Sequence, residues 1–517
     1  MSFTESVADI VQANTNGLLA KHSSWGRVPL RDVFYVQNGF PFESKYFNAC
    51  GDGKPLLRIR DIVSGTTETF YSGPYDDEFI VKPGDIVVGM DGDFNIRAWR
   101  GPEALLNQRV CRLAPRGGYL QELLPWVLQG YLNAINASTS AITVKHLSSR
   151  TVEEIPLPLP PASEQGRLLE SLESEMSRLD AAETSLQYVR GRLQAYRASV
   201  LKAAVEGRLV PTEAELARKE GREYEAASVL LDRILKERRH RWEENELARL
   251  MKAGKAPKDD RWKKKYEEPE APDTRKLSEL PQGWCWASIE QLSLRVFYGT
   301  SAKTSQDGEV PVLRMGNIID GVLDLADLKY LPADHPEFPE LFLKRGDLLF
   351  NRTNSAELVG KTAVYRGHPP TASFASYLIG ARLLVDAGWV SHVINSPYGR
   401  HWASDVAVQQ VGQANINGSK LKALAVPLPP LAEFDRILSQ VDRAHSSSQN
   451  VMTTLQREQL RVARLRQGIL KWAFEGKLVD QDPADEPAGR LLARIRAARA
   501  TTTTIKKSKN GKERLAG

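Results

Sequence analysis

IPLPLPPASEQGRLLESLESE (residues 155–175) and LAVPLPPLAEFDRILSQVDRA (residues 424–444) are two copies of one segment within a chain of 517 residues. They align at a constant offset of 269 residues. The same offset brings LKAAVEGRLV (201–210) onto LKWAFEGKLV (470–479). No gap is needed anywhere between these two stretches. A repeat of this length indicates a duplicated structural unit.

The duplication extends in weaker form to both sides. VLLDRILKER (229–238) is similar to RLLARIRAAR (490–499), LLRIRDI (56–62) to VLRMGNI (312–318), and VKPGDIVV (81–88) to LKRGDLLF (343–350). The upstream offsets drift from 256 to 262 before they reach 269, as expected where loops have diverged in length while strands have not. The chain therefore alternates a diverged segment with a repeated one, twice.

The repeated segments predict two long helices. Apolar residues recur every seven positions and form one row of a helix-packing seam. A second row of companion residues, three positions after members of the first row, should complete an a/d seam. The seam positions are Leu172, Leu179, Leu186, Leu193 and Val200 in the first copy and Val441, Ser448, Leu455, Val462 and Ile469 in the second; the companions are Val189, Tyr196, Leu465 and Trp472. A helix from Glu164 to Glu206 would rise about 65 Å, too long for the core of one small domain. We therefore expect the two helices to pack on each other; two helical hairpins within a globular core are the alternative.

The diverged segments predict mixed α/β domains. Short β-branched runs such as VVGM (87–90) and GARLLV (380–385) are separated by Gly, Asp, Asn and Pro residues. The expected fold class is α+β: two mixed α/β domains separated by two long helices packed as an antiparallel coiled coil, with a pseudo-twofold internal repeat. The expected segments are an N-terminal segment (1–24), a first domain (25–161), a central helical region with a basic extension (162–276), a second domain (277–430), a C-terminal helical region (431–500) and a basic tail, expected to be disordered (501–517).

Positive charge is concentrated in two places. The net charge is only +6, but residues 233–265 hold 13 Lys/Arg against 6 Asp/Glu, and residues 490–517 hold 9 against 1. The two α/β domains are close to neutral, with 14 Lys/Arg against 15 Asp/Glu over residues 24–160 and 13 against 14 over residues 277–430. Any binding of a polyanion is therefore expected to be local.

The composition also excludes several protein classes. Three cysteines without CxxC spacing argue against a disulfide scaffold and against a structural zinc site. The N-terminus lacks the pattern of a secretory signal, and no run of about 18 apolar residues occurs. We expect a cytoplasmic protein.

Two diverged domains that alternate with two near-identical helices, each introduced by a PLPP run, resemble the specificity subunit of a type I restriction-modification system. The helix ends EGRLV (206–210) and EGKLV (475–479) and the signatures LLRIRDI and KPGDIVV carry the resemblance, which covers nearly the whole chain. It implies a phage-defence protein in which each diverged domain is a target recognition domain for one half of a bipartite, asymmetric DNA sequence. The family pattern is interrupted at residues 233–275 by the charged extension.

The resemblance also implies the partners and the cofactors. The partners are double-stranded DNA, two modification (methyltransferase) subunits docked on the helices, and restriction (translocase/nuclease) subunits. S-adenosylmethionine would belong to the modification subunit, and ATP and Mg to the restriction subunit, with no cofactor in this chain.

Motifs for catalysis are missing from the sequence. There is no Asn-Pro-Pro-aromatic motif for transfer to an adenine amino group and no GxxxxGK[ST] phosphate loop. We therefore expect no catalytic residue, no metal site and a non-catalytic role. Two alternatives remain: a coiled-coil adaptor that binds only protein, which the near-neutral domains keep open, and a nuclease or methyltransferase with unrecognised motifs.

Candidate DNA-binding residues lie in polar loops next to predicted strands. Arg and Asn can make bidentate contacts with guanine and adenine edges, and Lys can contact phosphates. For each candidate, a solvated surface position is an equally good interpretation, and Arg58, Arg60 and Arg109 suit salt bridges at the rim of the core. The candidates are Lys45, Asn95, Arg97 and Arg100 in the first domain and Lys303, Asn351, Arg352, Asn354 and Lys361 in the second.

Overall fold

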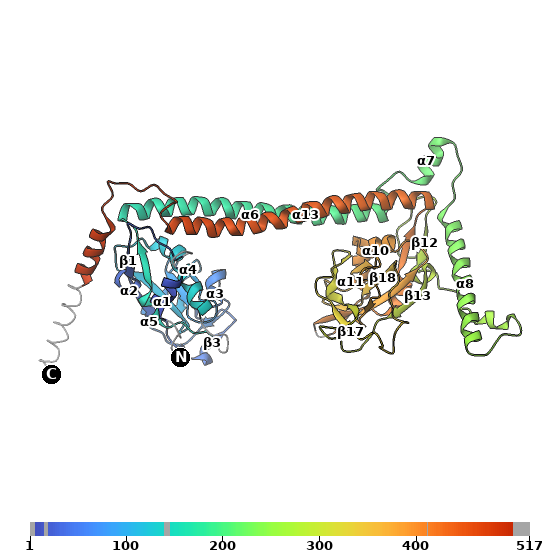
Figure 1. Cartoon of the computed structure of the whole chain (residues 1–517), viewed down its shortest axis with the longest axis horizontal. Coiled ribbons are helices and arrows are strands. Elements are labelled where there is room, and N and C mark those ends of the chain that lie inside the picture. Colours follow the sequence, from blue (N-terminus) through green and yellow to red (C-terminus); the bar gives the residue numbers. More distant parts are fainter. Residues whose placement is uncertain (1–5, 15–18, 139–144, 411, 500–517) are drawn as a thin grey trace. The chain divides into compact units, whose positions relative to one another are not determined.

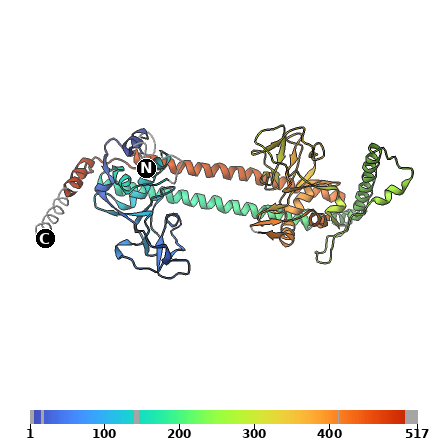
Figure 2. The ribbon, with the colours of Figure 1, turned by 90° about the horizontal axis from the view of Figure 1, so that it is seen from below.

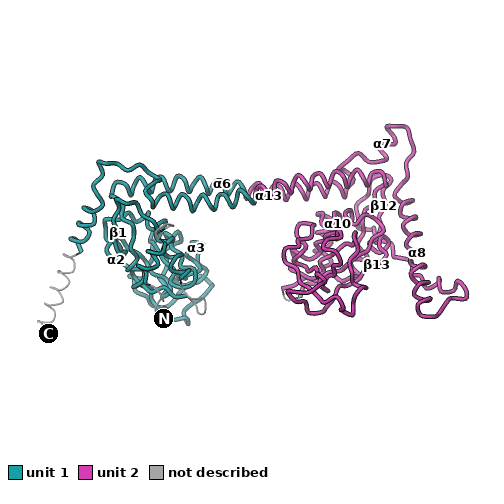
Figure 3. Tube along the Cα trace, in the orientation of Figure 1, with its two compact units in different colours: residues 1–187, 456–517 teal, residues 188–455 magenta. Residues whose placement is uncertain are grey.

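The computed structural model describes residues 6–14, 19–138, 145–410 and 412–499. It divides into two compact units, residues 1–187 with 456–517 and residues 188–455 (Figure 3). Each unit contains an α/β domain and one part of each long helix. The predicted basic tail at 501–517 lies outside the described residues.

The domain of unit 1 is built on a four-stranded antiparallel sheet of order β2-β10-β7-β8 and a five-stranded sheet of order β3-β5-β4-β9-β6 (Figure 1). Its elements are α1 (Val7–Ala13), β1 (Gly26–Pro29), α2 (Leu30–Val33), β2 (Phe34–Asn38), η1 (Ser44–Tyr46), β3 (Phe47–Asn48), β4 (Lys54–Leu57), α3 (Asp61–Ser64), β5 (Phe70–Tyr71), η2 (Asp77–Phe79), β6 (Ile80–Val81), β7 (Ile86–Gly89), β8 (Ile96–Ala98), β9 (Ala104–Leu106), β10 (Val110–Pro115), η3 (Gln121–Leu123), α4 (Leu124–Ser138), α5 (Ser149–Glu154) and β11 (Pro156–Leu159).

The domain of unit 2 repeats the first sheet with the order β13-β22-β18-β20, again antiparallel throughout. Its elements are β12 (Cys285–Ser288), α9 (Ile289–Leu292), β13 (Ser293–Tyr298), β14 (Val310–Leu313), η5 (Met315–Asn317), β15 (Ile318–Ile319), β16 (Val322–Leu323), β17 (Lys329–Leu331), β18 (Asp347–Asn351), β19 (Thr353–Asn354), β20 (Thr362–Val364), β21 (Ser373–Phe374), β22 (Leu378–Leu383), α10 (Ala387–Asn395), α11 (Pro397–Val406), β23 (Val408–Gln410), β24 (Gln413–Asn415), α12 (Gly418–Ala423) and β25 (Ala425–Leu428).

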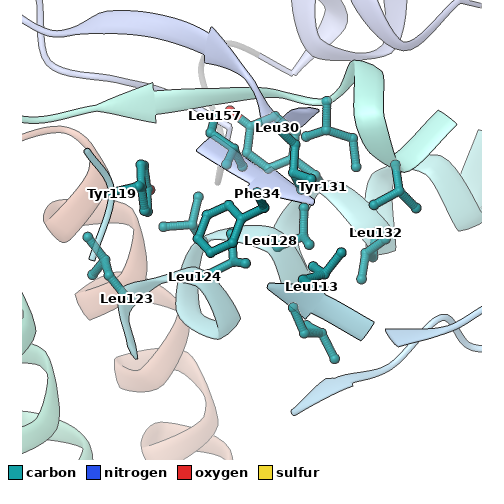
Figure 4. Close-up of a cluster of buried hydrophobic side chains, with 14 of the residues drawn as sticks. Leu30, Phe34, Leu113, Tyr119, Leu123, Leu124, Leu128, Tyr131, Leu132 and Leu157 are labelled. Atoms are coloured by element: carbon teal, nitrogen blue, oxygen red, sulfur yellow. The ribbon is translucent and has the colours of Figure 1, made fainter. Parts of the chain in front are cut away.

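The core of each domain lies between its sheet and its helices. In unit 1, Phe34 of β2, Leu113 of β10 and Leu128 of α4 point toward one another (Figure 4), and each is at most 1% exposed. Burial of such side chains contributes about 1.5–3 kcal/mol each to folding. The sheet that carries the candidate residues is thereby held rigidly.

A matching turn introduces the third strand of each four-stranded sheet, at the sequences KPGD (82–85) and KRGD (344–347). Gly84 and Gly346 both have φ +93, a conformation that favours glycine. The next residue, Asp85 or Asp347, accepts the N–H of the residue three before it, at 2.9 and 2.8 Å. Each carboxylate also pairs with an arginine of the neighbouring strand, at 3.2 and 2.7 Å. The same local sequence thus builds the same turn twice.

The PLPP runs close the two domains. β11 pairs antiparallel with β1, and β25 pairs antiparallel with β12, so the first and last strands of each domain lie side by side. Proline fixes an extended backbone and lacks an N–H, which suits a two-stranded edge pair. Each domain is therefore entered and left at one point, directly before a long helix.

A buried tryptophan–glutamate pair joins each domain to its helix. Trp25 Nε1 donates to Glu164 Oε2 at 3.0 Å, and Trp284 Nε1 donates to Glu433 Oε1 at 3.0 Å. The two glutamates are 1% and 0% exposed and lie in the first turn of α6 (Ala162–Val205) and α13 (Leu431–Phe474). Burial raises the pKa of Glu433. The positive end of the helix dipole favours a carboxylate there.

The long helices pack on each other within each unit. In unit 1, Asp180 of α6 pairs with Arg466 of α13. In unit 2, Arg197 of α6 donates to Gln449 of α13 at 3.1 Å. In unit 1, Gln481, beyond the end of α13, also donates to Glu164 at the start of α6. In unit 2, Arg436 near the start of α13 also pairs with Glu213, beyond the end of α6. Within each unit, later residues along α6 therefore meet earlier residues along α13, and the neighbouring segments run antiparallel.

The predicted companion row of the seam is wrong. Val189, Tyr196, Leu465 and Trp472 are exposed, Trp472 by 56%. The second row lies four residues after most seam positions instead: Met176, Arg197 and Ala204 in α6, and Met452, Arg466 and Ala473 in α13. The seven-residue spacing fits either choice, because a heptad alternates steps of three and four. The seam residues occupy the heptad positions that are followed by a step of four residues, not three.

The central region continues after α6 with α7 (Glu213–Glu220), α8 (Ala227–Lys252) and the short helix η4 (Asp260–Lys265). Ala227 and Ile234, in the first part of α8, are buried against the domain of unit 2. None of the described helices has the length and apolarity needed to span a membrane.

Candidate nucleic-acid interface

The predicted DNA-binding loops occupy equivalent places in the two units. Asn95, Arg97 and Arg100 follow β7, and Asn351, Arg352 and Asn354 end or follow β18. β7 and β18 are both the third strand in the order of the four-stranded sheets, each between its equivalent neighbours. The duplicated sheet therefore presents a polar loop at the same strand end in each unit.

In unit 2 the structure brings four of the five predicted residues together. Lys303, Asn351, Asn354 and Lys361 line one cavity of about 840 Å³. Lys303 comes from the loop after β13, while the others come from β18, β19 and the turn before β20. We call this cavity the reading groove.

The two asparagines differ in which side-chain atoms remain available for a hydrogen bond. Asn351 is only 1% exposed, and its Oδ1 accepts no hydrogen bond among the described residues. Asn354 is half-buried, and its Oδ1 accepts the Ser355 N–H at 2.8 Å, which leaves the amide NH₂ as a donor. The fifth residue, Arg352, lies over the Tyr298 ring at 4.9 Å, beside the groove rather than in its lining.

The groove also contains residues that were not predicted. Arg314 lines it and pairs with Asp327 at 2.7 Å, and Met315, Ile319 and Tyr377 add exposed apolar side chains. Apolar groups can contact thymine methyls, and Arg can contact guanine. Arg314 lies in VLRMGNI, which had indicated only the repeat. Its position in this strand–turn signature is the sequence signal that could have identified it as a groove residue.

In unit 1 the candidates form two groups. Arg97 and Arg100 are near each other on the β7–β8 side; desolvation and then repulsion from Arg100 lower the pKa of Arg97. A phosphate placed there would relieve this repulsion. Asn95 lies in the turn between β7 and β8, and its backbone oxygen accepts the Gly89 N–H at 2.9 Å. Arg97 lies within β8 itself, where the sequence had predicted a loop. Lys45 lies on η1 beside the five-stranded sheet and pairs with Glu43 at 2.6 Å.

The arginines that suited rim salt bridges have acidic neighbours. Arg60 lies 3.8 Å from Asp61, and Arg109 lies 3.4 Å from Asp91. These contacts favour the structural interpretation for both.

The sequence and structural comparisons agree with this geometry. Residues 22–186 match the family described as Type I restriction modification DNA specificity domain. The chain is 31% identical to the Type I restriction enzyme EcoBI specificity subunit of Escherichia coli over 521 residues, covering 98% of this chain and 99% of that protein. The chain belongs to the family of type I restriction enzyme specificity subunits. It is thus the subunit that confers DNA sequence specificity.

Two further similarities were found, one in sequence and one in fold. The Type I restriction enzyme EcoKI specificity subunit of Escherichia coli (strain K12) is 24% identical over 73% of this chain and 71% of that protein. A solved structure titled "Structural basis underlying complex assembly and conformational transition of the type I R-M system" matches 88% of this specificity subunit and 99% of its own chain. Its TM-score is 0.56 at 15% identity. This match shows a shared fold.

Substitutions in the reading groove should separate base contacts from phosphate contacts. In this specificity subunit, we expect Asn354→Ala to relax discrimination at one base pair of one half-site by about 1–3 kcal/mol. Lys303→Ala should instead weaken binding about equally on all sequences and reduce the salt dependence by about one phosphate contact. Competition binding on single-base variants of the target, at several salt concentrations, measures both effects.

The matched control is Asn450→Ala on the exposed surface of α13. It should change neither quantity. An Asn354→Ala variant with unaltered base discrimination would remove this residue from the interface.

Proposed function

We propose that this specificity subunit recognises a bipartite, asymmetric DNA target, with one half-site bound by each α/β domain. The two domains correspond to the predicted ranges 25–161 and 277–430. The observation that carries the proposal is the duplicated four-stranded sheet, which presents Asn and Arg side chains at the same strand end in both units. Because the two loops differ in sequence, the two half-sites should differ as well.

The domains carry no net positive charge, so recognition should use a small number of side chains in each groove. Lys303, Asn351, Asn354 and Lys361 fit this role in unit 2, and Asn95, Arg97 and Arg100 fit it in unit 1. Lys45 and Arg352 complete the proposed set at the edge of each interface.

The long helices are proposed to form one antiparallel coiled coil that sets the distance between the half-sites and docks two methyltransferase subunits. Exposed Tyr188, Tyr196 and Trp472 on these helices offer apolar surface for such docking. Restriction subunits would join through the complex in the cytoplasm. S-adenosylmethionine, ATP and Mg would be held by the partners, and this chain would be non-catalytic.

The test is a reconstitution. We expect the purified chain alone to transfer no methyl group to DNA, and to support transfer once methyltransferase subunits and S-adenosylmethionine are added. Methylation is measured with labelled S-adenosylmethionine on genomic DNA. Methyl transfer by the rigorously purified single chain would contradict the proposal.

A further inference from the structure

The charged extension of the central region folds into a defined arm. We define the basic arm as residues 239–266: the second half of α8, the turn after it and η4. α8 ends at Lys252, Gly254 adopts φ +67, and the Lys255 N–H donates to the Leu250 carbonyl at 2.9 Å, which reverses the chain. The returning segment then runs back along α8.

Aromatic stacking holds the two legs of the arm together. Trp242 stacks on Trp262 with ring centroids 6.1 Å apart and meets Tyr266 at 5.3 Å. Arg238 donates to the Tyr266 hydroxyl at 2.6 Å and lies over its ring. Such contacts give the arm a fixed shape.

The arm is anchored to the domain of unit 2. Arg238 Nε donates to the Ser293 carbonyl at the start of β13, at 3.1 Å, and Ser288 donates to the Glu270 carbonyl at 2.6 Å. Beyond these anchors the arm extends away from the domain (Figures 1 and 2). It therefore moves with this domain.

Comparison of the two repeat copies distinguishes the arm from the first part of α8. Residues 229–238 have a counterpart at 490–499, where Leu491 and Ile495 are buried against the domain of unit 1. Residues 239–256 are not similar to residues 500–517, which follow that counterpart. The shared part packs on the domain, and the arm begins where the similarity ends.

Within the described part of the chain, most lysines of the arm form no salt bridge, and Lys263 is the exception. The arm contains ten Lys/Arg against five Asp/Glu. Its arginines are all in ion pairs, for example Arg241 with Glu237 at 2.6 Å and Arg249 with Glu246 at 2.6 Å. Five lysines form no salt bridge among the described residues: Lys252, Lys255, Lys258, Lys264 and Lys265. Positive charge is thus presented mainly at the turn, away from the anchors.

The chemistry of this surface suits phosphates rather than a protein partner. Protein interfaces are enriched in aromatic residues and Arg and depleted in Lys, and the aromatic side chains here are used within the arm. Free lysines suit the phosphates of DNA. The domain beside the arm holds 13 Lys/Arg against 14 Asp/Glu and supplies no such clamp itself.

We propose that the basic arm binds the phosphate backbone of duplex DNA outside the target, on the flank next to the half-site of unit 2. The inference rests on the proposed function, in which the helices span the spacer. Within unit 2, α8 and the arm lie on the same side of the domain as the end of α6 and the start of α13, opposite the side on which both helices leave the unit (Figure 3). The duplex that meets the arm is therefore beyond the half-site.

The test compares the complex with methyltransferase subunits carrying the wild-type chain or the variant K252Q/K255Q/K258Q/K264Q. The probe is a duplex containing the target found by methylome mapping, with long flanks on both sides. We expect the variant to bind about 10- to 100-fold more weakly, with a salt slope lower by about three and unchanged base preference. Trimming the flank beside the half-site of unit 2 should abolish the difference, and trimming the other flank should preserve it.

The outcomes distinguish the two proposals. If the wild-type complex shows no sequence-specific binding, the proposed function fails. If it binds specifically but the variant equals the wild type on long flanks, the arm inference fails alone. The arm inference is also overturned if the variant no longer captures the methyltransferase subunits, or if the defect persists on the trimmed duplex.

Discussion

Exchange of residues 26–159 for the corresponding domain of another specificity subunit is expected to replace one half-site completely and leave the other unchanged. The structure supplies the junctions: β1 and β11 pair, so the exchanged piece begins and ends on adjacent strands. Trp25 and Glu164 remain outside it and keep their 3.0 Å hydrogen bond. The new domain is then joined to α6 through the same hydrogen bond as the original domain.

Methylome sequencing of cells expressing the hybrid complex measures both half-sites at once. The matched control exchanges residues 285–428, bounded by β12 and β25, and should change the opposite half-site. A folded hybrid whose two half-sites both change, or neither, would contradict the assignment of one domain to one half-site.

The sequence predicts the framework because the framework is repeated. The constant offset located both PLPP junctions and both long helices, and the KPGD and KRGD motifs located the same turn in two domains. Local signals of this kind depend on residues near one another in the chain, such as a glycine with positive φ or a proline in an extended segment.

Features that depend on distant residues were predicted less well. The spacing of seam residues fits two heptad assignments, and only the partner helix shows that Ala473 rather than Trp472 belongs to the seam. Likewise, Lys303 and Asn351 were proposed separately, and the position of Arg314 in the strand–turn signature does not show that it lies in the same groove. That groove forms from loops that meet only in the folded domain.

Insertion of four residues into both helices is expected to lengthen the spacer of the DNA target. Asp180 pairs with Arg466 in unit 1, and the antiparallel arrangement of the two helices there places Gln187 opposite Gln459. The insertions therefore belong after Gln187 and after Glu458. Four residues in each helix add about 6 Å and a rotation of about 40° beyond one full turn, and coiled coils absorb insertions of four by local unwinding.

The distance and the rotation between the two half-sites on the DNA should change by a matching amount. The added length corresponds to a little under two base pairs at about 3.4 Å each, and two base pairs advance the duplex by about 70° in the same sense as the helix rotation. We expect the complex to methylate targets whose spacer is longer by one or two base pairs, with both half-sites unaltered. The control inserts four residues after Gln187 alone; the unmodified α13 should then hold the original distance while α6 loops out. Single-molecule methylation mapping provides the measurement. If the double insertion still methylates the original spacing at full rate, the helices only connect the two domains and do not set their distance.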